Sequence, residues 1–499
     1  MNLRDLLINI PVQQSSGNLL LNISGIAQDS RSVKPGDLFL CVKGARFNGH
    51  HYLKQAAEAG AVAAIVSEWP TCDFGLTLVL VPEVTNPVIK EIAGAFYGYP
   101  DRRLKLIGVV GTNGKTTSTY LMKSILEAAG HKVGLIGTIA NLAGDQSIET
   151  GNGSHNTTPG VLELQKLFAA MAEAGIQYVV MEVSSHSIAQ DRVWGLSFIG
   201  GIFTNITQDH LDYHKTFAEY LKVKSRFFVE LPQTAWAVLN LDDPHSNGMI
   251  SQTSARVLTY GIEHPAQIKA EDVSLEHTGV SYHVCMPDGK IKLNLHLTGY
   301  FNVYNSLGVF GAGLALGIEP ATIKIGLEKV MGVPGRFQTV PGASSFGVIV
   351  DYAHTPDGLE NILATARRLT SQRLLLVFGC GGDRDRTKRP LMGELAAKMS
   401  DFTIITSDNP RTENPLSIIQ EIEAGFKKAN PAASYQVEPD REKAIRKIIG
   451  LANDSDIVII AGKGHETYQE FADRTIHFDD REIARAALEE RLNDRNRVK

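Results

Sequence analysis

The chain alternates short apolar runs with stretches in which apolar residues recur at helical spacing. Residues 104–110 are mostly apolar, a glycine-flanked turn follows, and residues 116–129 carry a helical pattern that Gly130 ends. This alternation favours an α/β fold built on parallel sheets. Further strands are expected at residues 23–26, 38–42, 61–66, 133–137, 178–183, 201–204, 348–351, 374–378, 402–406 and 457–461, and further helices at 51–59, 217–228, 359–369 and 481–492.

The length and two breaks in the pattern predict three domains. A chain of 499 residues exceeds the roughly 250–300 residues at which single hydrophobic cores stop growing. A turn at residues 97–101 comes just before the strand expected at 104–110, and residues 331–337 form a linker that contains glycine and proline. We therefore expect domains at residues 1–100, 101–333 and 334–499.

Composition narrows the classes of partner. Apolar residues make up 43% and charged residues 21% of the chain, which is ordinary for a soluble globular protein. The net charge of −5 argues against a nucleic-acid partner, which needs a basic surface. The four cysteines form no CxxC pair, the N-terminus shows no signal peptide, and no apolar run approaches the ~20 residues of a membrane span. We expect a cytoplasmic monomer that binds small molecules and neither a membrane nor nucleic acid.

The strongest chemical signal is Gly111-Thr112-Asn113-Gly114-Lys115-Thr116-Thr117, between an expected strand and an expected helix. In such a turn, backbone N–H groups face a nucleotide's phosphates, the lysine reaches the terminal phosphates and a threonine hydroxyl holds Mg²⁺. The strict phosphate-loop pattern requires glycine where this chain has Val109. The direct succession of strand, Gly-Lys-Thr-Thr and helix still favours phosphate binding over an ordinary turn.

Polar residues near other expected elements have more than one interpretation. Glu182 ends an apolar run, where a carboxylate can hold Mg²⁺ directly or through water. His210 and His214 have the spacing of zinc ligands on a helix, but no third ligand accompanies them, so zinc is not favoured. From the sequence alone, Lys224 is interpreted as a solvated helix lysine and Cys380 as a packed thiol.

Several separated motifs occur in one order along nearly the whole chain. They are the phosphate loop, Asn156-Thr157-Thr158-Pro159, Glu182-Val183-Ser184-Ser185-His186, Asp209-His210-Leu211-Asp212, Phe301-Asn302 with Asn305, Gly335-Arg336 and Asp351-Tyr352-Ala353-His354-Thr355-Pro356. Together they resemble the Mur ligase family, ATP-dependent amide-forming enzymes of peptidoglycan precursor synthesis. The resemblance implies three domains, with a central P-loop ATPase-like parallel sheet and a C-terminal Rossmann-like domain. It also accounts for Val109, since this family has a shorter glycine loop.

The resemblance implies a role for each matching residue. ATP is expected to contact Gly111, Thr112, Asn113, Gly114, Lys115, Thr116, Thr117, Asn302, Arg336 and Asp351. The uridine nucleotide is expected at Ser30, Ala45, Arg46 and Phe47, and the muramoyl-dipeptide end at Asn156, Thr157, Thr158, Ser184, Gln190 and Arg192. Mg²⁺ is expected at Thr116, Glu182 and His210. Lys224 is expected to be carbamylated, as in the family, and to reach the metal as an anion, so the catalytic set is Lys115, Glu182, His210 and Lys224.

Asp408-Asn409-Pro410-Arg411 resembles the signature of members that add meso-2,6-diaminopimelate to UDP-N-acetylmuramoyl-L-alanyl-D-glutamate. Diaminopimelate differs from lysine by a carboxylate at its far end, which a guanidinium binds with two parallel hydrogen bonds. Lysine is expected to leave Arg411 unpaired, and sites of this kind discriminate by ~10⁴. The same amino acid is expected to contact Arg384, Asp408, Asn409, Pro410, Arg411, Gly462 and Glu466.

Other classes of protein share part of this pattern. A lysine-adding ligase or a folylpolyglutamate-type synthetase has the same architecture, but Arg411 and Asp29-Ser30-Arg31 argue against both. A nucleotide-binding switch has no need of a third α/β domain with arginine-lined loops.

Overall fold

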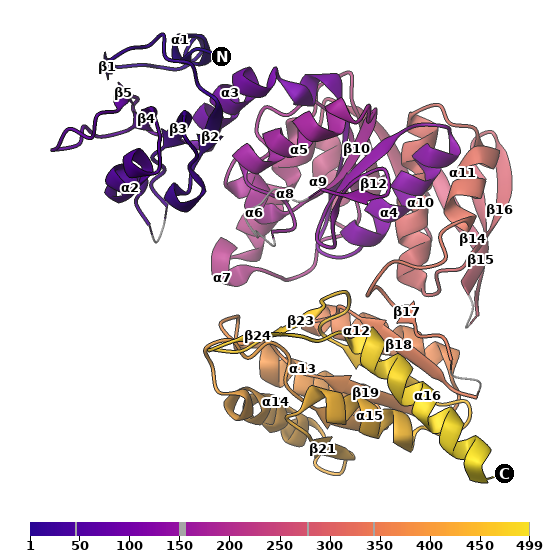
Figure 1. The fold of residues 1–499 in the computed structure, drawn as a ribbon. Coiled ribbons are helices and arrows are strands. Elements are labelled where there is room, and N and C mark those ends of the chain that lie inside the picture. The colour runs from indigo at the N-terminus through magenta and orange to yellow at the C-terminus, as the bar shows by residue number, and fades with distance from the viewer. Residues whose placement is uncertain (45–46, 149–155, 277–278, 343–344, 499) are drawn as a thin grey trace.

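The computed structural model describes residues 1–44, 47–148, 156–276, 279–342 and 345–498. The predicted sites Ala45 and Arg46 lie outside the described residues. Figure 1 shows three bodies, each built around its own sheet. Within the described ranges, no helix is long and apolar enough to cross a membrane.

The N-terminal body has a five-stranded sheet in the order β1-β5-β4-β3-β2. Neighbouring strands from β2 to β5 run parallel, and β1 is antiparallel at one edge. The helix expected at residues 51–59 begins as a 3₁₀ turn and continues as α2. The elements are α1 Leu3–Leu6, β1 Gln14–Ser16, β2 Gly25–Ala27, β3 Asp37–Leu40, a 3₁₀ turn Gly49–Tyr52, α2 Leu53–Glu58, β4 Ala63–Val66, β5 Thr77–Leu80 and α3 Asn86–Tyr97.

The middle body is built on an eleven-stranded sheet, and its interior strand β6 (Lys105–Val110) leads into the phosphate loop. Strand β6 pairs in parallel with β10 (Tyr178–Val183) and β11 (Phe198–Phe203). The polar residues after these strands therefore meet at one edge of the sheet. Helix α4 (Lys115–Ala128) packs on the sheet through Leu121, Met122 and Ile125. The remaining elements are β7 Val133–Ile136, β8 Asn141–Ala143, β9 Gln146–Ser147, α5 Val161–Glu173, α6 Ser185–Ala189, α7 Leu211–His214, α8 Phe217–Val229, β12 Trp236–Asn240, α9 Ser246–Gln252, β13 Arg256–Gly261, α10 Tyr300–Ala315 and α11 Pro320–Glu328.

Strands β14 (Ile268–Glu276), β15 (Gly279–Met286) and β16 (Gly289–Leu295) extend the middle sheet and were not predicted. Strand β14 pairs in parallel with β13, and the other two follow as antiparallel hairpins. Their inner faces bury Val280, Tyr282 and Leu293 against α10 and α11.

The C-terminal body has a six-stranded sheet in the order β17-β18-β22-β19-β20-β21, and only β17 is antiparallel. Separate apolar clusters cover its two faces, as in a doubly wound α/β domain. A two-stranded ribbon, β23 with β24, lies on the side of this body that faces the middle body (Figure 1). The elements are β17 Gln338–Thr339, β18 Gly347–Asp351, α12 Pro356–Leu369, β19 Leu374–Phe378, α13 Lys388–Met399, β20 Phe402–Ile405, α14 Pro415–Ala429, β21 Tyr435–Val437, α15 Arg441–Leu451, β22 Ile457–Ala461, β23 Tyr468–Glu470, β24 Thr475–His477 and α16 Asp480–Val498.

Strand β11 begins three residues before the start expected from its apolar run. Its Gly200 and Gly201 interrupt the apolar pattern because aromatic rings fill the space of the missing side chains. A Cβ on Gly200 would lie 2.1 Å from the Trp236 ring, and one on Gly201 would lie 2.5 Å from Phe227. The glycines thus continue the strand and do not end it.

Candidate active site

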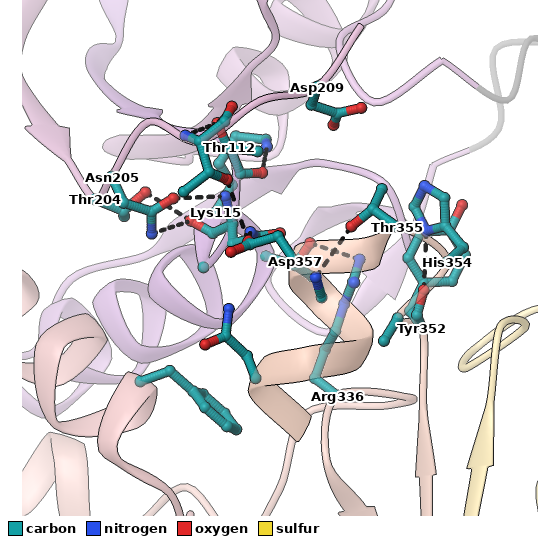
Figure 2. A pocket seen from close by; sticks show the side chains of 18 of the residues that line it. Thr112, Lys115, Thr204, Asn205, Asp209, Arg336, Tyr352, His354, Thr355 and Asp357 are labelled. Atoms are coloured by element: carbon teal, nitrogen blue, oxygen red, sulfur yellow. Dashed lines mark hydrogen bonds between the residues drawn. The ribbon is translucent and has the colours of Figure 1, made fainter. Parts of the chain in front are cut away.

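A cavity of about 1150 Å³ lies between the phosphate loop and the carboxyl ends of the C-terminal strands. Its lining comes from the middle and C-terminal bodies, so neither body forms the site alone. Figure 2 shows Lys115 and Thr112 of the phosphate loop facing Arg336, Tyr352 and His354 across this cavity.

Hydrogen bonds from its own lysine stabilise the phosphate loop. The Lys115 Nζ donates to the carbonyl oxygens of Gly111 (2.9 Å) and Thr112 (2.8 Å). The loop also depends on its first glycine, since a Cβ on Gly111 would lie 1.8 Å from the Thr204 Oγ1. The Asn113 N–H donates to the Asn205 Oδ1 at 3.0 Å. The loop that the sequence indicated is therefore held by the residues that follow β11.

Glu182 is buried beside the start of α4. Its Oε2 accepts from the Thr116 Oγ1 at 3.0 Å, and its Oε1 accepts from the Thr138 N–H at 2.9 Å. The Thr138 Oγ1 lies 3.1 Å from the Glu182 Oε2. The Arg336 Nη2 donates to the Thr116 Oγ1 at 3.0 Å from across the cavity. A carboxylate and a hydroxyl are the hard oxygen donors that Mg²⁺ prefers, so the residues present fit that ion.

The interpretation of Lys224 as a solvated lysine is wrong. Its side chain is 1% exposed, and its Nζ donates to the Gly111 carbonyl at 2.7 Å and lies 4.8 Å from the centre of the Tyr220 ring. Burial, with a further contribution from the nearby Lys115 charge, lowers the pKa of Lys224 well below its ordinary value. Helical periodicity could not show this, because the face of α8 that carries Lys224 packs under the phosphate loop.

His210 and His214 do not point to a common ligand. His210 lines the cavity, with its Nε2 3.4 Å from the Asp209 Oδ2. His214 is buried, and its Nε2 lies 2.9 Å from the Ser185 Oγ. The ring of His186 lies beside both histidines, with centroid distances of 4.8 Å to His210 and 5.6 Å to His214. Among the described residues, no group of three or more His, Cys, Asp or Glu side chains could hold a metal ion by itself.

Most residues expected at the muramoyl-dipeptide end meet in the same cavity. The Arg192 Nη1 donates to the Thr158 carbonyl at 2.9 Å, and its Nη2 donates to the Gln190 Oε1 at 2.6 Å. The Thr158 Oγ1 donates to the Glu182 carbonyl at 2.8 Å, and the Ser184 N–H donates to the Thr158 Oγ1 at 3.0 Å. The members of this set that line the cavity are Asn156, Thr157, Ser184 and Arg192.

Two residues expected at the uridine nucleotide belong to the N-terminal body and lie away from this cavity lining. Ser30 is buried and donates to the Gln55 Oε1 at 2.8 Å. Phe47 is 69% exposed. The Asn86 Nδ2 donates to the Gln190 carbonyl at 2.6 Å and connects this body to the dipeptide end of the cavity.

Two residues expected at the nucleotide have partners within the protein. Both oxygens of Asp351 accept backbone N–H groups, from Phe337 at 2.6 Å and Ala353 at 2.7 Å, and burial raises the pKa of Asp351. Asn302 is buried behind the cavity wall, where its Oδ1 accepts from the Asn305 Nδ2 at 3.1 Å. Asn305 is among the cavity-lining residues, so Asn302 holds the side chain that reaches the cavity.

Arg411 lines the other end of the cavity and already has partners. Its Nε donates to the Glu470 Oε2 at 3.0 Å, and its Nη1 donates to the Gly382 carbonyl at 2.8 Å. The expectation that Arg411 stays unpaired without a second ligand carboxylate is therefore wrong. Arg384, Asp408, Asn409, Gly462 and Glu466 line the same end.

Sequence reasoning missed Lys463, which is fully buried beside Glu466. The Lys463 Nζ lies 2.9 Å from the Glu466 Oε2 and 3.0 Å from the Asn409 Oδ1. The Asn409 Nδ2 donates to the Glu466 Oε2 at 2.8 Å. Glu466, one of the residues expected to contact the incoming amino acid, thus already binds an ammonium of the protein. The lysine lies within Gly462-Lys463-Gly464-His465-Glu466, but nothing in that pattern indicates burial.

Asp357, also missed, joins the C-terminal body to the phosphate loop. Its Oδ2 accepts from the Asn113 Nδ2 at 2.5 Å and from the Thr207 Oγ1 at 3.1 Å. Burial raises the pKa of Asp357. No local signal could identify this residue, because its partners come from a different domain.

A phosphate loop that faces the strand ends of a second α/β body defines a two-domain catalytic site of the nucleotide-dependent ligase type. The sequence matches three family descriptions: the Mur ligase family catalytic domain over residues 22–103, the Mur ligase middle domain over 109–313, and the Mur ligase glutamate ligase domain over 335–464. The chain belongs to the Mur ligase family.

Similar proteins carry more particular names. The chain is 47% identical, over 94% of its length and 96% of the relative, to the UDP-N-acetylmuramoyl-L-alanyl-D-glutamate–2,6-diaminopimelate ligase of Geobacillus thermodenitrificans. It is also 47% identical to the protein of that name from Clostridium botulinum, over 94% and 95% of the two chains. A solved structure of a ligase of that name is 30% identical, covers 99% of both chains and has a TM-score of 0.68. The MurF ligase of Thermotoga maritima in complex with ADP shares the fold, at 17% identity and a TM-score of 0.64.

Proposed function

We propose that this protein is the ATP-dependent ligase that adds meso-2,6-diaminopimelate to UDP-N-acetylmuramoyl-L-alanyl-D-glutamate. The names of its relatives support this activity. The observation that carries the proposal is that Lys115 of the phosphate loop and Arg411 of the Asp408-Asn409-Pro410-Arg411 loop line one cavity. A single space of this kind lets an activated carboxyl group and an incoming amine meet.

The proposed reaction has two steps. The γ-carboxylate of the D-glutamyl residue attacks the γ-phosphorus of ATP, ADP leaves, and an acyl phosphate forms. The neutral amine of diaminopimelate then attacks the acyl carbon, and the tetrahedral intermediate expels phosphate and loses a proton. Lys115 and Arg336 both line the cavity, and we assign to them the role of offsetting the negative charge that develops on the phosphoryl oxygens. His210 and His354 both line the cavity and are candidates for accepting the amine proton.

Thr116, Glu182, His210 and a carbamylated Lys224 are the residues proposed to hold Mg²⁺. The ion supplies neutralisation of phosphate charge when it is bound. The low pKa of buried Lys224 supports carbamylation, since only the neutral amine reacts with CO₂. The Nζ–carbon bond forms, one proton leaves, and a carbamate anion replaces the neutral amine beside Lys115.

We also propose the domain boundaries 1–100, 101–333 and 334–499 and a monomer that works in the cytoplasm. All four cysteines are free thiols in the structure, which is typical of a reducing compartment. Light scattering measures the molar mass in solution, which is expected to be that of a single chain. Limited proteolysis is expected to cut first near the domain boundaries at residues 100 and 333.

The direct test is a product assay with ATP, the UDP-muramoyl-dipeptide and one amino acid at a time. We expect UDP-muramoyl-tripeptide and ADP with diaminopimelate, and little product with lysine or glutamate. Preferred use of lysine would favour a lysine-adding ligase, and preferred use of glutamate a folylpolyglutamate-type enzyme. Brisk ATP hydrolysis by the enzyme alone would favour a nucleotide switch.

A further inference from the structure

We propose that Glu470 is a positioning residue that sets the selectivity for the incoming amino acid by fixing the orientation of the Arg411 guanidinium. The inference rests on the proposed function, because it concerns the amino acid that Arg411 recognises. The residues named for that amino acid from the sequence do not include Glu470, and Glu470 is not among the cavity-lining residues.

Strand β23 forms hydrogen bonds with three residues of the Asp408-Asn409-Pro410-Arg411 loop. The Gln469 Nε2 donates to the Asp408 carbonyl at 2.7 Å, and the Glu470 N–H donates to the Asn409 Oδ1 at 3.0 Å. The Arg411 N–H donates to the Glu470 carbonyl at 3.1 Å. Strand β23, which ends in Glu470, therefore determines where the backbone of Arg411 lies.

Arg411 needs this support because its backbone is in the left-handed region, with φ of 52°. Residues other than glycine rarely adopt that backbone conformation, and they retain it only where surrounding contacts enforce it. The N–H bond to the Glu470 carbonyl is one such contact, and the bond from the Gly382 N–H to the Asn409 carbonyl (2.9 Å) holds the loop from the other side.

The guanidinium itself is oriented by two contacts. Glu470 accepts from Nε at 3.0 Å and the Gly382 carbonyl accepts from Nη1 at 2.8 Å. The guanidinium is planar, so fixing two of its nitrogens fixes the directions of all five N–H groups. These two contacts do not use the second N–H of Nη1 or the two N–H groups of Nη2. Those groups lie at the end of the Arg411 side chain, which lines the cavity. That end suits the far carboxylate of a diamino diacid.

Two effects of Glu470 oppose each other, and the geometry indicates which is larger. As an anion, Glu470 competes with a ligand carboxylate for Arg411; as an acceptor, it holds Arg411 in the binding orientation. The Glu470 side chain is 42% exposed, so water screens its charge, whereas the Arg411 side chain is only 19% exposed and depends on its contacts for orientation. We therefore expect orientation to dominate.

The test compares E470A, E470Q and the control D473A in the full-length enzyme. Asp473 lies on the same ribbon, but its carboxylate pairs with Arg474 on the surface. E470A is expected to raise the KM for diaminopimelate about tenfold with kcat within about twofold, and to leave the KM for lysine unchanged. E470Q keeps an acceptor for Nε and is expected to restore the KM for diaminopimelate, and D473A is expected to behave as wild type.

Each other outcome overturns the inference in a distinct way. An unchanged KM in E470A means that Glu470 does not orient Arg411. A lower KM for diaminopimelate in both E470A and E470Q means that Glu470 acts as a competing anion. Equal losses with diaminopimelate and lysine mean a general structural role. The product assay with the wild-type enzyme tests the proposed function separately. If the wild-type enzyme does not use diaminopimelate, the proposed function is wrong, whatever the Glu470 variants do.

Discussion

Lys115 and Lys224 donate to the same carbonyl oxygen, that of Gly111, at 2.9 Å and 2.7 Å. Two buried ammonium groups so close to each other repel, and burial lowers the pKa of both. Lys115 has the nearby Glu182 carboxylate to stabilise its charge, whereas the Lys115 charge adds to the lowering at Lys224. Lys224 is therefore the member of the pair whose pKa is lowered further, and a carbamate at Lys224 would turn the repulsion into attraction.

The first prediction concerns this lysine pair. K224A is expected to lower kcat by 100-fold or more, because the proposed metal site loses an anionic ligand. Short carboxylic acids are expected to restore part of the activity of K224A by occupying the vacated space. K224R, which keeps a cation and fills that space, is the matched control and is expected to be inactive with and without added acid. Full activity of K224A would contradict the carbamate.

The second prediction concerns the hydroxyl behind the proposed magnesium site. The Thr138 Oγ1 lies 3.1 Å from the Glu182 Oε2 and 3.0 Å from the Thr157 Oγ1. T138V keeps the shape but removes these bonds, and groups that orient a metal ligand commonly change metal affinity 10–100-fold. We expect the Mg²⁺ concentration for half-maximal activity to rise about tenfold in T138V and to stay at the wild-type value in T138S. Equal values for the two variants would show that the hydroxyl does not orient Glu182.

The third prediction concerns pH and stability. Burial, together with the nearby Lys388 charge, lowers the pKa of His354 to about 4 from its ordinary value of 6.5. The unfolded chain therefore binds this proton at a higher pH than the folded chain, so His354 favours unfolding as the pH falls from about 6.5 towards 4.

Urea unfolding at pH 7.5 and pH 5 measures this effect. H354Q is expected to lose less unfolding free energy between these pH values than the wild-type protein loses. The difference should be on the order of 1–2 kcal/mol, since each unit of pKa shift corresponds to about 1.4 kcal/mol. H296Q, at an exposed histidine of the middle body, is the control and should follow the wild type. Identical pH dependence in all three proteins would contradict a buried neutral His354.

Local sequence patterns predicted the elements well where burial is continuous. Strands β10, β19 and β22 have the predicted bounds, because a buried parallel strand is an unbroken apolar run. The hairpins β14 to β16 were missed because their outer faces carry charged residues, such as Glu271 and Lys290, that dilute the apolar signal. Alternating patterns of this kind are weaker than continuous ones.

The site was predictable where one motif carries the chemistry and not where distant segments meet. The phosphate loop could be identified because it follows a strand, and Glu182 because it lies near the end of one. Thr138, Asp357 and Glu470 could not, since each acts through a contact with another segment: Glu182, Asn113 and Arg411, respectively. Their roles depend on contacts between segments that are distant in the sequence and meet only in the folded chain.

The last prediction concerns the guanidinium that is proposed to select the amino acid. Arg411 also donates to the Gly382 carbonyl, so a bound lysine does not leave the guanidinium wholly unpaired, and discrimination below ~10⁴ is expected. A charge-assisted hydrogen bond contributes about 1.5–3 kcal/mol, or roughly 10–100-fold.

The most direct measurement is therefore the ratio of kcat/KM for diaminopimelate to kcat/KM for lysine in the wild-type enzyme and in R411A. We expect the wild-type ratio to favour diaminopimelate strongly and R411A to reduce it by about 10–100-fold, with the KM for ATP unchanged. A ratio that R411A leaves intact would contradict the proposal that this arginine selects the substrate.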